Sequence, residues 1–197
     1  MKVDFVYSYP YDRIFCELLK VKQREKEVER FIKKLKKKRI FILKAAKKIE
    51  EITGLKFKKD VKCYVVSDTL WKGFSDPLTI RATSINEFIS VLIHELIHII
   101  SVQNKEKMER LNKLRDKKFK LPKHIRVHIW VYIVEKKVKR IIKFKDNPKQ
   151  RTNIKKRYKN DLIKGYKKAR EVANQLEKEL PNKNLVKEFE KYLNKNL

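Results

Sequence analysis

The chain has 197 residues, 42% of them hydrophobic, which is enough to bury a core and argues against general disorder. Lysine and arginine number 53 against 24 aspartates and glutamates, a net charge of +29. The two cysteines, Cys16 and Cys63, are isolated in the sequence, which excludes a disulfide-rich scaffold and a cysteine-based zinc module and fits a reducing compartment.

The charge excess has two competing interpretations. It can attract a polyanion such as nucleic acid or an anionic membrane surface, or it can be the lysine-rich surface found in proteins of heat-adapted organisms. The positive charge is concentrated between Lys113 and Arg170, where 23 lysines and arginines accompany only 4 acidic residues. This segment therefore predicts, at most, weak and non-specific nucleic-acid binding.

No part of the sequence predicts secretion or membrane insertion. Residues 1–13 contain neither a long apolar segment nor a small-residue cleavage site. The longest apolar-rich segment, residues 88–102, is too short for a membrane span and contains two histidines and a glutamate. We therefore expect a cytoplasmic protein without a membrane span.

The first part of the chain is predicted to contain one long helix and three strands. Residues 3–8 are expected to form a short strand. A long helix is expected over residues 15–53, because apolar side chains recur on one stripe, and Gly54 is its expected C-cap. The β-branched residues 61–67 and the alternating residues 78–83 predict two further strands, the second of which could be an edge along which a peptide lies.

The rest of the chain is predicted to be mostly helical. Ser84 and Glu87 have the spacing of a capping box directly before an apolar run, so a helix is expected over residues 85–107. The charged segment that follows, up to residue 120, is helical or a loop. Further helices are expected over residues 123–144, 152–179 and 183–195.

These elements divide the chain into three parts of one compact unit. Residues 1–60 supply a strand and a long helix packed on the core, residues 61–145 form the core that contains all four histidines, and residues 146–197 form a helical extension. The predicted fold class is therefore α+β, predominantly helical with a small sheet.

The stretch VLIHELIHII places three polar side chains in a run of branched apolar residues. His94 and His98 are four residues apart, so both imidazoles project from one face of the predicted helix and can reach one Zn²⁺. Glu95 directly follows His94, so its side chain lies beside the histidine face of the helix, where it can hold a metal-bound water. In this HExxH pattern the metal lowers the pKa of the water, and the glutamate takes its proton and delivers it to the leaving amine. The sequence thus predicts a zinc metallopeptidase with Glu95 as general base.

A second polar stripe lies on the next predicted helix. His124, His128, Tyr132 and Glu135 follow one another at same-face helical steps among apolar residues. A buried polar stripe needs a polar partner, which a metal on the neighbouring helix would supply. The alternative is a solvent-facing stripe on a helix that buries only its apolar side.

The third zinc ligand must come from outside the motif helix, because a catalytic zinc has three protein ligands and an open fourth position. We predict Glu135, which lies where the apolar face ends and a cleft could open. His128 is the alternative, and His124 also stays open. A helix rises about 1.5 Å per residue, so Glu135 cannot share one metal with His124 and is not expected to share it with His128. His128 or Tyr132 could still reach a substrate bound at the zinc.

At this point the sequence resembles a known family. HELIH followed by a helix with a glutamate looks like the zincin metallopeptidases, and among them the gluzincins, whose third ligand is a glutamate on a later helix. In size and layout residues 61–140 are similar to the compact archaeal minigluzincins. The resemblance implies a zincin-like fold with the two helices side by side, a Zn²⁺ cofactor and a peptide or protein substrate. It also implies that Tyr132 or His128 stabilises the oxyanion. The Asn-Glu pair and later Asp common around the gluzincin ligand are absent here.

Two other classes of protein remain open. A Spartan-like metalloprotease completes HExxH with a third histidine and acts on DNA-bound proteins. His128 or His124 could be that histidine, and the positive charge would suit DNA. Such proteins often add a cysteine-rich zinc module, which two isolated cysteines cannot form. The other class is a non-enzymatic protein that binds RNA or DNA through residues 113–170. Its stacking aromatics would be Phe119, Phe144, Tyr158 and Tyr166. Zinc content separates this class from the metalloproteases.

Overall fold

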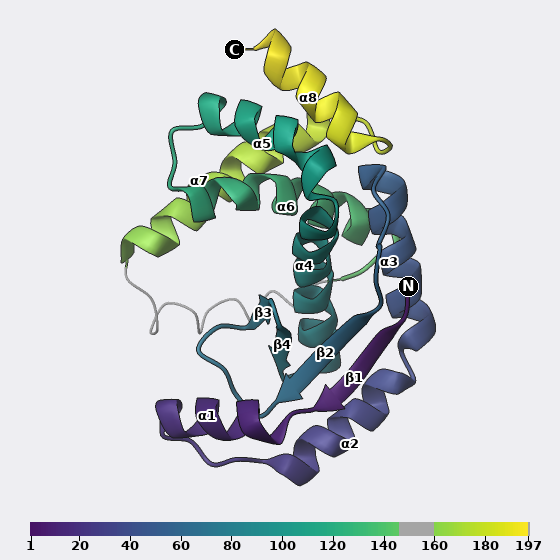
Figure 1. Cartoon of the computed structure of the whole chain (residues 1–197), viewed down its shortest axis with the longest axis vertical. Helices are drawn as coiled ribbons and strands as arrows, with labels where there is room; N and C mark the ends of the chain where they lie inside the picture. The colour runs from purple at the N-terminus through teal and green to yellow at the C-terminus, as the bar shows by residue number, and fades with distance from the viewer. Residues whose placement is uncertain (146–159, 197) are drawn as a thin grey trace.

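A four-stranded sheet and the helices around it make up the fold (Figure 1). The structure, a computed structural model, describes residues 1–145 and 160–196. The elements are, in chain order, β1 (Val3–Tyr7), α1 (Tyr9–Leu19), α2 (Glu25–Lys36), α3 (Arg39–Thr53), β2 (Val61–Val66), β3 (Gly73–Ser75), β4 (Leu78–Arg81), α4 (Ile85–Gln103), α5 (Lys105–Lys118), α6 (Lys123–Ile141), α7 (Asn160–Glu179) and α8 (Leu185–Lys195). The predicted α+β class, mostly helical with a small sheet, is confirmed.

The strand order in the sheet is β1-β2-β4-β3, with β1, β2 and β4 parallel and β3 antiparallel to β4. Residues 78–83 were expected to offer an open edge, and this prediction is wrong, because the short strand β3 pairs with β4 on that side. The sequence gives little sign of β3, which is only three residues long and contains Gly73. Gly73 is needed there because a Cβ would lie 2.9 Å from Val91 of α4.

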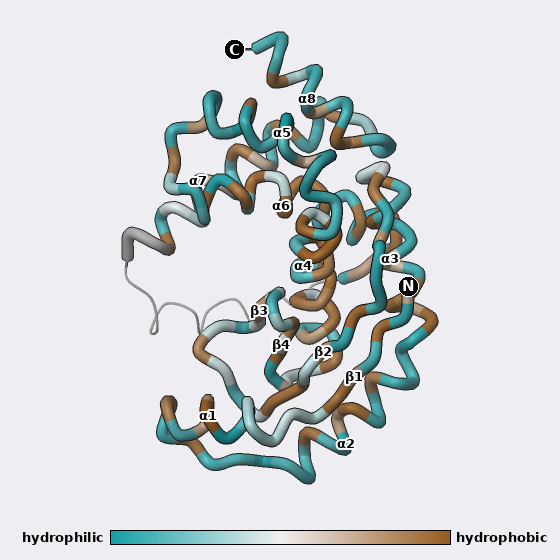
Figure 2. The backbone as a smooth tube through the Cα atoms, in the orientation of Figure 1, coloured by the Kyte–Doolittle hydropathy of each residue, from teal (hydrophilic) through white to brown (hydrophobic). Residues whose placement is uncertain are grey.

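Helix α4 is the central element of the core and lies between the sheet and α6 (Figure 1). Figure 2 shows that hydrophobic residues are concentrated on α4 and the strands, whereas α5 and α8 are largely hydrophilic. Phe88 of α4 is fully buried and packs edge-on against Phe5 of β1 and Phe31 of α2, at ring-centroid distances of 5.9 and 5.3 Å. This packing fixes α4 against the sheet and sets the direction in which its polar residues point.

Side-chain caps define both ends of α4. The predicted cap at its start is present, since the hydroxyl of Ser84 accepts a hydrogen bond from the backbone N–H of Glu87. The helix ends four residues earlier than expected. Asn104 is buried and its side-chain amide donates to the carbonyl groups of Ile100 and Lys56, both at 2.8 Å, which stops the helix and allows α5 to begin in a new direction.

The single long helix expected over residues 15–53 is in fact three helices, and this prediction is wrong. Helix α1 starts early, with Pro10 in its first turn, and ends at Lys20 in a left-handed conformation. The chain then turns because the backbone N–H of Arg24 is held by the hydroxyl of Ser67 at 2.8 Å. Gly54 is the C-cap of α3, as predicted, with φ of 73°.

The predicted C-terminal helices are present in the described residues. Residues 183–195 were expected to be helical, and α8 begins two residues later. The expected helix over residues 152–179 is described from Asn160 onward, and its first eight residues lie outside the described residues. The expected break at residues 145–148 lies almost entirely outside them as well.

Helix α7 is fastened to α6 through a buried lysine. The ammonium group of Lys137, a residue 1% exposed, donates to the carbonyl oxygens of Glu177 (2.9 Å) and Leu180 (2.6 Å) at the end of α7, and to Asn182 Oδ1 (3.2 Å). The buried carboxylate of Glu177 lies nearby and also pairs with Arg140. Lys137 therefore caps the C-terminus of α7 while remaining on α6.

We expect Lys137→Met to lower the free energy of unfolding by about 2–4 kcal/mol, because it leaves the buried carbonyl groups of Glu177 and Leu180 without their donor and removes one cation beside the buried Glu177 carboxylate. Urea unfolding measures the loss. Lys136→Met is the matched control, since its side chain is 45% exposed and, in the described part of the chain, contacts the side chains of Glu177 and Asn174 but no backbone carbonyl. We expect it to cost less than about 1 kcal/mol. Equal losses in the two variants would contradict the capping role.

Helix α4 is long and apolar enough, by length and composition, to cross a membrane. The core helix of a soluble protein meets the same criterion. Here α4 contacts the sheet, α3 and α6, and the rings of His94 and His98 lie against His128 of α6. The absence of a membrane span stays an expectation from the sequence.

Candidate metal centre

Helices α4 and α6 bring three histidines together. His94 and His98 of α4 and His128 of α6 are all partly buried, and one ring nitrogen of each lies within 4.8 Å of the other two. Their ring centroids form a nearly regular triangle, with sides of 5.1, 5.2 and 4.9 Å. The Nε2 atoms of His94 and His98 are 3.3 Å apart. Because α4 contacts α6 directly, the motif helix and the polar stripe face each other.

Hydrogen bonds on the outer side of the cluster orient two of these rings. His94 Nδ1 lies 2.9 Å from Oε2 of Glu135, and His128 Nδ1 lies 2.6 Å from the backbone carbonyl of His124. Both partners are acceptors, so they favour the tautomer that carries its proton on Nδ1 and leaves Nε2 with a free lone pair. Acceptors of this kind, behind the ligand rings, are typical of histidine metal sites.

Glu135 lies behind His94 instead of beside the three ligand nitrogens. Its second carboxylate oxygen is held by Lys139, which also contacts the hydroxyl of Ser90 on α4. Burial alone would raise the pKa of Glu135, but the hydrogen bond from His94 and the charge of Lys139 hold that pKa well below its ordinary value. The carboxylate is therefore ionised and has two partners, which suits a group that orients a ligand histidine.

Burial and mutual repulsion keep two of the histidines neutral. Burial, followed by the neighbouring charge of His94, lowers the pKa of His98 to about 2 and that of His128 to about 4. Burial also opposes the charged form of His94, but the hydrogen bond to Glu135 together with the charges of Glu135 and Glu95 outweighs it and raises the pKa of this ring. The neutral imidazole is the form that binds a metal, so His98 and His128 are already in that form, and three histidine ligands with an open fourth position fit Zn²⁺.

Glu95 is nearly buried beside the cluster, with 8% of its surface exposed. Within residues 1–145 and 163–196, no hydrogen bond or ion pair engages its carboxylate. Burial raises the pKa of Glu95, against the opposing charge of His94. A buried carboxylate without a protein partner next to three ligand nitrogens is what a general base acting on a small bound molecule requires.

Aromatic side chains from α6 and α7 form one wall of the site. The ring of Tyr132 is 5.7 Å from those of both His94 and His128, and the ring of Tyr166 stands edge-on to His128 at 4.8 Å. Burial and the charge of Glu95 raise the pKa of Tyr166, so its hydroxyl lies within reach of that charge. Arg170, one turn further along α7, lies over the Tyr132 ring at 4.8 Å.

The structure thus brings together His94, Glu95, His98, His128 and Tyr132 around one point. Glu135, predicted as the third ligand, contacts Nδ1 of His94, and the three side chains whose nitrogens could hold one metal ion are His94, His98 and the alternative candidate His128. His124 is not part of the cluster, and its ring packs near Tyr166.

No sequence motif pointed to Lys139 or Arg170 as part of this site, and Tyr166 was expected only as a stacking aromatic. The four-residue spacing of Tyr166 and Arg170 puts both on one face of α7, but no motif connects that face to the histidines. Their place in the site follows from the packing of α7 on α6, where Gly165 allows close approach because a Cβ would lie 3.0 Å from Ile125.

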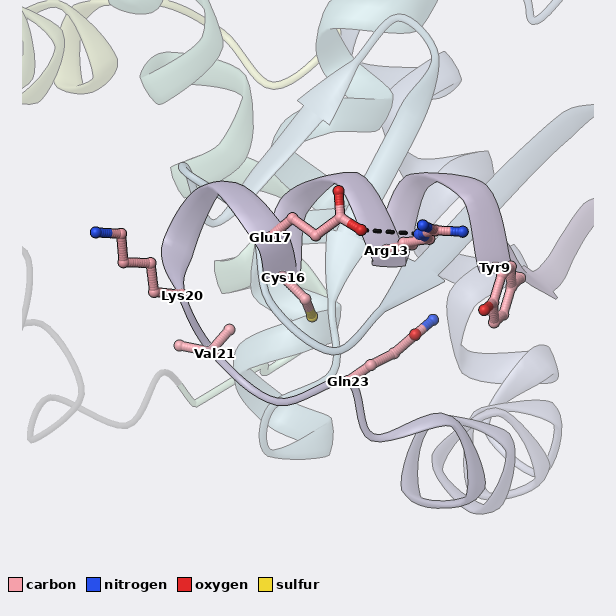
Figure 3. A pocket seen from close by; sticks show the side chains of 7 residues that line it. All are labelled: Tyr9, Arg13, Cys16, Glu17, Lys20, Val21 and Gln23. Carbon is pink, nitrogen blue, oxygen red and sulfur yellow. Dashed lines mark hydrogen bonds and ion pairs between the residues drawn. The ribbon is translucent and has the colours of Figure 1, made fainter.

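A pocket of about 360 Å³ lies elsewhere, along α1 and the segment after it (Figure 3). Its lining includes Cys16 and an ion pair between Arg13 and Glu17. Burial raises the pKa of the Cys16 thiol to about 11, so this thiol is not a nucleophile at neutral pH. None of the residues around the histidine cluster lines this pocket.

No protein-family model matches the chain, and no curated protein or solved structure shows significant similarity to it. The interpretation of the site therefore depends on its own geometry and chemistry.

Proposed function

We propose that this protein is a zinc-dependent metallopeptidase whose ligands are His94, His98 and His128 and whose general base is Glu95. The observation that carries the proposal is the convergence of three ligand nitrogens within 4.8 Å, beside a buried carboxylate without a protein partner. The fold is proposed to be zincin-like, because the HExxH helix lies between a small mixed sheet and the helix that supplies the third ligand.

In the proposed peptide hydrolysis the metal, Glu95 and two tyrosines have different roles. Zn²⁺, when bound, would supply Lewis acidity that lowers the pKa of a water and polarises the carbonyl to be cut. Glu95 accepts the proton from the attacking water and passes it to the departing amine. The rings of Tyr132 and Tyr166 both pack against His128, and their hydroxyl groups are candidates to donate a hydrogen bond to the developing oxyanion.

Glu135 and Lys139 act as positioning residues in this proposal. Glu135 fixes the ring of His94 through Nδ1, and Lys139 holds Glu135 through an ion pair one helical turn away. Because Lys139 also contacts Ser90 of α4, the arrangement connects the two helices that carry the ligands. A carboxylate behind a ligand histidine raises the basicity of that ligand.

Metal analysis tests the proposal most directly. Protein purified without added zinc should contain about one Zn²⁺ per chain, and a chelator should remove both the metal and the hydrolysis of an unstructured protein such as casein. Restoring Zn²⁺ should restore the activity. Protein that is metal-free and stays so after incubation with Zn²⁺ would overturn the assignment.

A Spartan-like, DNA-associated metalloprotease is the second candidate, and the presence of His128 in the cluster favours it. The positive charge between Lys113 and Arg170 also suits it. Hydrolysis that requires added DNA, and DNA binding that weakens steeply with salt, would support this candidate over a general peptidase.

A purely nucleic-acid-binding protein is less well supported by the side chains. Phe119, Phe144 and Tyr166 are partly buried and pack against the hydrophobic core, so they are not free platforms for stacked bases. Tyr158 lies outside the described residues. We propose that nucleic-acid binding through residues 113–170 is weak and non-specific, and that the peptidase acts in the cytoplasm.

A further inference from the structure

Arg170 is an exposed cation at the rim of the histidine cluster. It stands on α7 one turn after Tyr166, and its guanidinium lies 4.8 Å from the centre of the Tyr132 ring. The same ring is 5.7 Å from the rings of His94 and His128. Tyr132 therefore has both a positive charge and two of the proposed metal ligands as neighbours.

The charge of Arg170 is not neutralised by the described part of the protein. Within residues 1–145 and 163–196 it forms no ion pair with a carboxylate. The neighbouring cations on α6 differ in this respect, because Lys139 pairs with Glu135 and Arg140 pairs with Glu177. The carboxylates of Glu135 and Glu177 near the site are thus already paired with other cations, and Glu95 is the proposed general base.

We infer that Arg170 recognises a carboxylate of the bound substrate close to the bond that is cut. The inference rests on the proposed function, and names a substrate class for the same site. A guanidinium offers paired donors that match a carboxylate, and packing on an aromatic ring holds those donors in place. An extended peptide advances about 3.3 Å per residue, so a carboxylate beyond one tyrosine ring belongs to a residue roughly one to three positions from the cut.

The carboxylate can come from an acidic side chain or from the C-terminus of the substrate. Binding to zinc-loaded Glu95→Gln protein, which holds peptide without cutting it, distinguishes the two. The probes are alanine-based octapeptides with a neutral fluorophore, in three forms: a central Glu with an amidated end, a central Gln with an amidated end, and a central Gln with a free end. Fluorescence anisotropy gives each dissociation constant.

Arg170→Met should weaken binding of at least one charged probe about 10-fold and leave the neutral probe unchanged, and Arg170→Lys should recover part of the loss. A loss confined to the Glu probe assigns an acidic side chain, and one confined to the free end assigns the terminus. Lys168→Met, exposed on the same helix, should change none of the three. Equal affinity of the unaltered protein for all probes, or an equal loss for the neutral probe in Arg170→Met, would overturn the inference.

Failure of the proposed function gives a different result. Charge-dependent binding through Arg170 in a chain whose parent form never hydrolyses peptides would reject the peptidase and keep carboxylate recognition. Zinc-dependent hydrolysis together with peptide binding that does not change in Arg170→Met would keep the peptidase and reject carboxylate recognition by Arg170.

Discussion

Glu95→Gln is expected to hold zinc as tightly as the parent protein and to lose peptide hydrolysis by about 10²–10⁴-fold, the contribution typical of a general base. Glutamine has nearly the same shape as glutamate but cannot accept the proton of the attacking water. Glu95 is 8% exposed and has no partner among the described residues. Replacing it with glutamine therefore breaks no ion pair, and we expect the fold to be retained. Single-turnover hydrolysis of casein and zinc content are the two measurements.

Glu109→Gln is the matched control for this experiment. Glu109 lies on α5, and its side chain is 64% exposed and pairs only with Lys113. We expect unchanged activity and unchanged zinc content. Hydrolysis undiminished in Glu95→Gln, with zinc present, would remove Glu95 from the reaction and with it the HExxH interpretation.

His128→Ala is expected to be purified without zinc, whereas Glu135→Gln keeps zinc with an affinity about 10–100-fold weaker than the parent, the usual cost of changing a residue behind a ligand. The reason is positional. A nitrogen of His128 lies with those of His94 and His98, while Glu135 contacts the far nitrogen of His94. Competition with a zinc-binding dye measures both affinities.

His124→Ala provides the control for a lost histidine. Its ring lies outside the cluster, and the group that orients His128 is its backbone carbonyl, which the exchange preserves. We expect zinc binding close to that of the parent. If Glu135→Gln loses zinc and His128→Ala retains it, the ligand set is that of a gluzincin, as the sequence resemblance implied.

The sequence was sufficient to locate the motif helix and its polar partner. The capping pattern at Ser84 and the i, i+4 spacing of His94 and His98 are local properties, so α4 and its two ligand positions could be predicted without knowledge of the fold. The stripe on the next helix was equally local. Spacing also argued against a metal shared by His128 and Glu135. Both still reach His94, because Glu135 bonds to its Nδ1 and the ring of His128 stacks on its ring.

The choice between His128 and Glu135 could not be made locally. It depends on how α6 is displaced along α4, and long-range contacts determine that displacement, such as the hydrogen bond from Trp130 Nε1 to the hydroxyl of Ser101 at 3.1 Å. The three-helix arrangement of residues 9–53 was missed for a similar reason. Its break depends on Ser67, 43 residues beyond Arg24.

The capping of α7 by Lys137 has a consequence for the order in which this protein can mature. The three histidines of the cluster are synthesised by residue 128, but Tyr166, which packs against His128, and the carbonyl groups that satisfy Lys137 are on α7 and the residue that follows it. A growing chain that has completed α6 therefore has its metal-binding residues and still lacks one side of the site. The histidine cluster is therefore covered on this side only after α7 has been synthesised and has packed on α6.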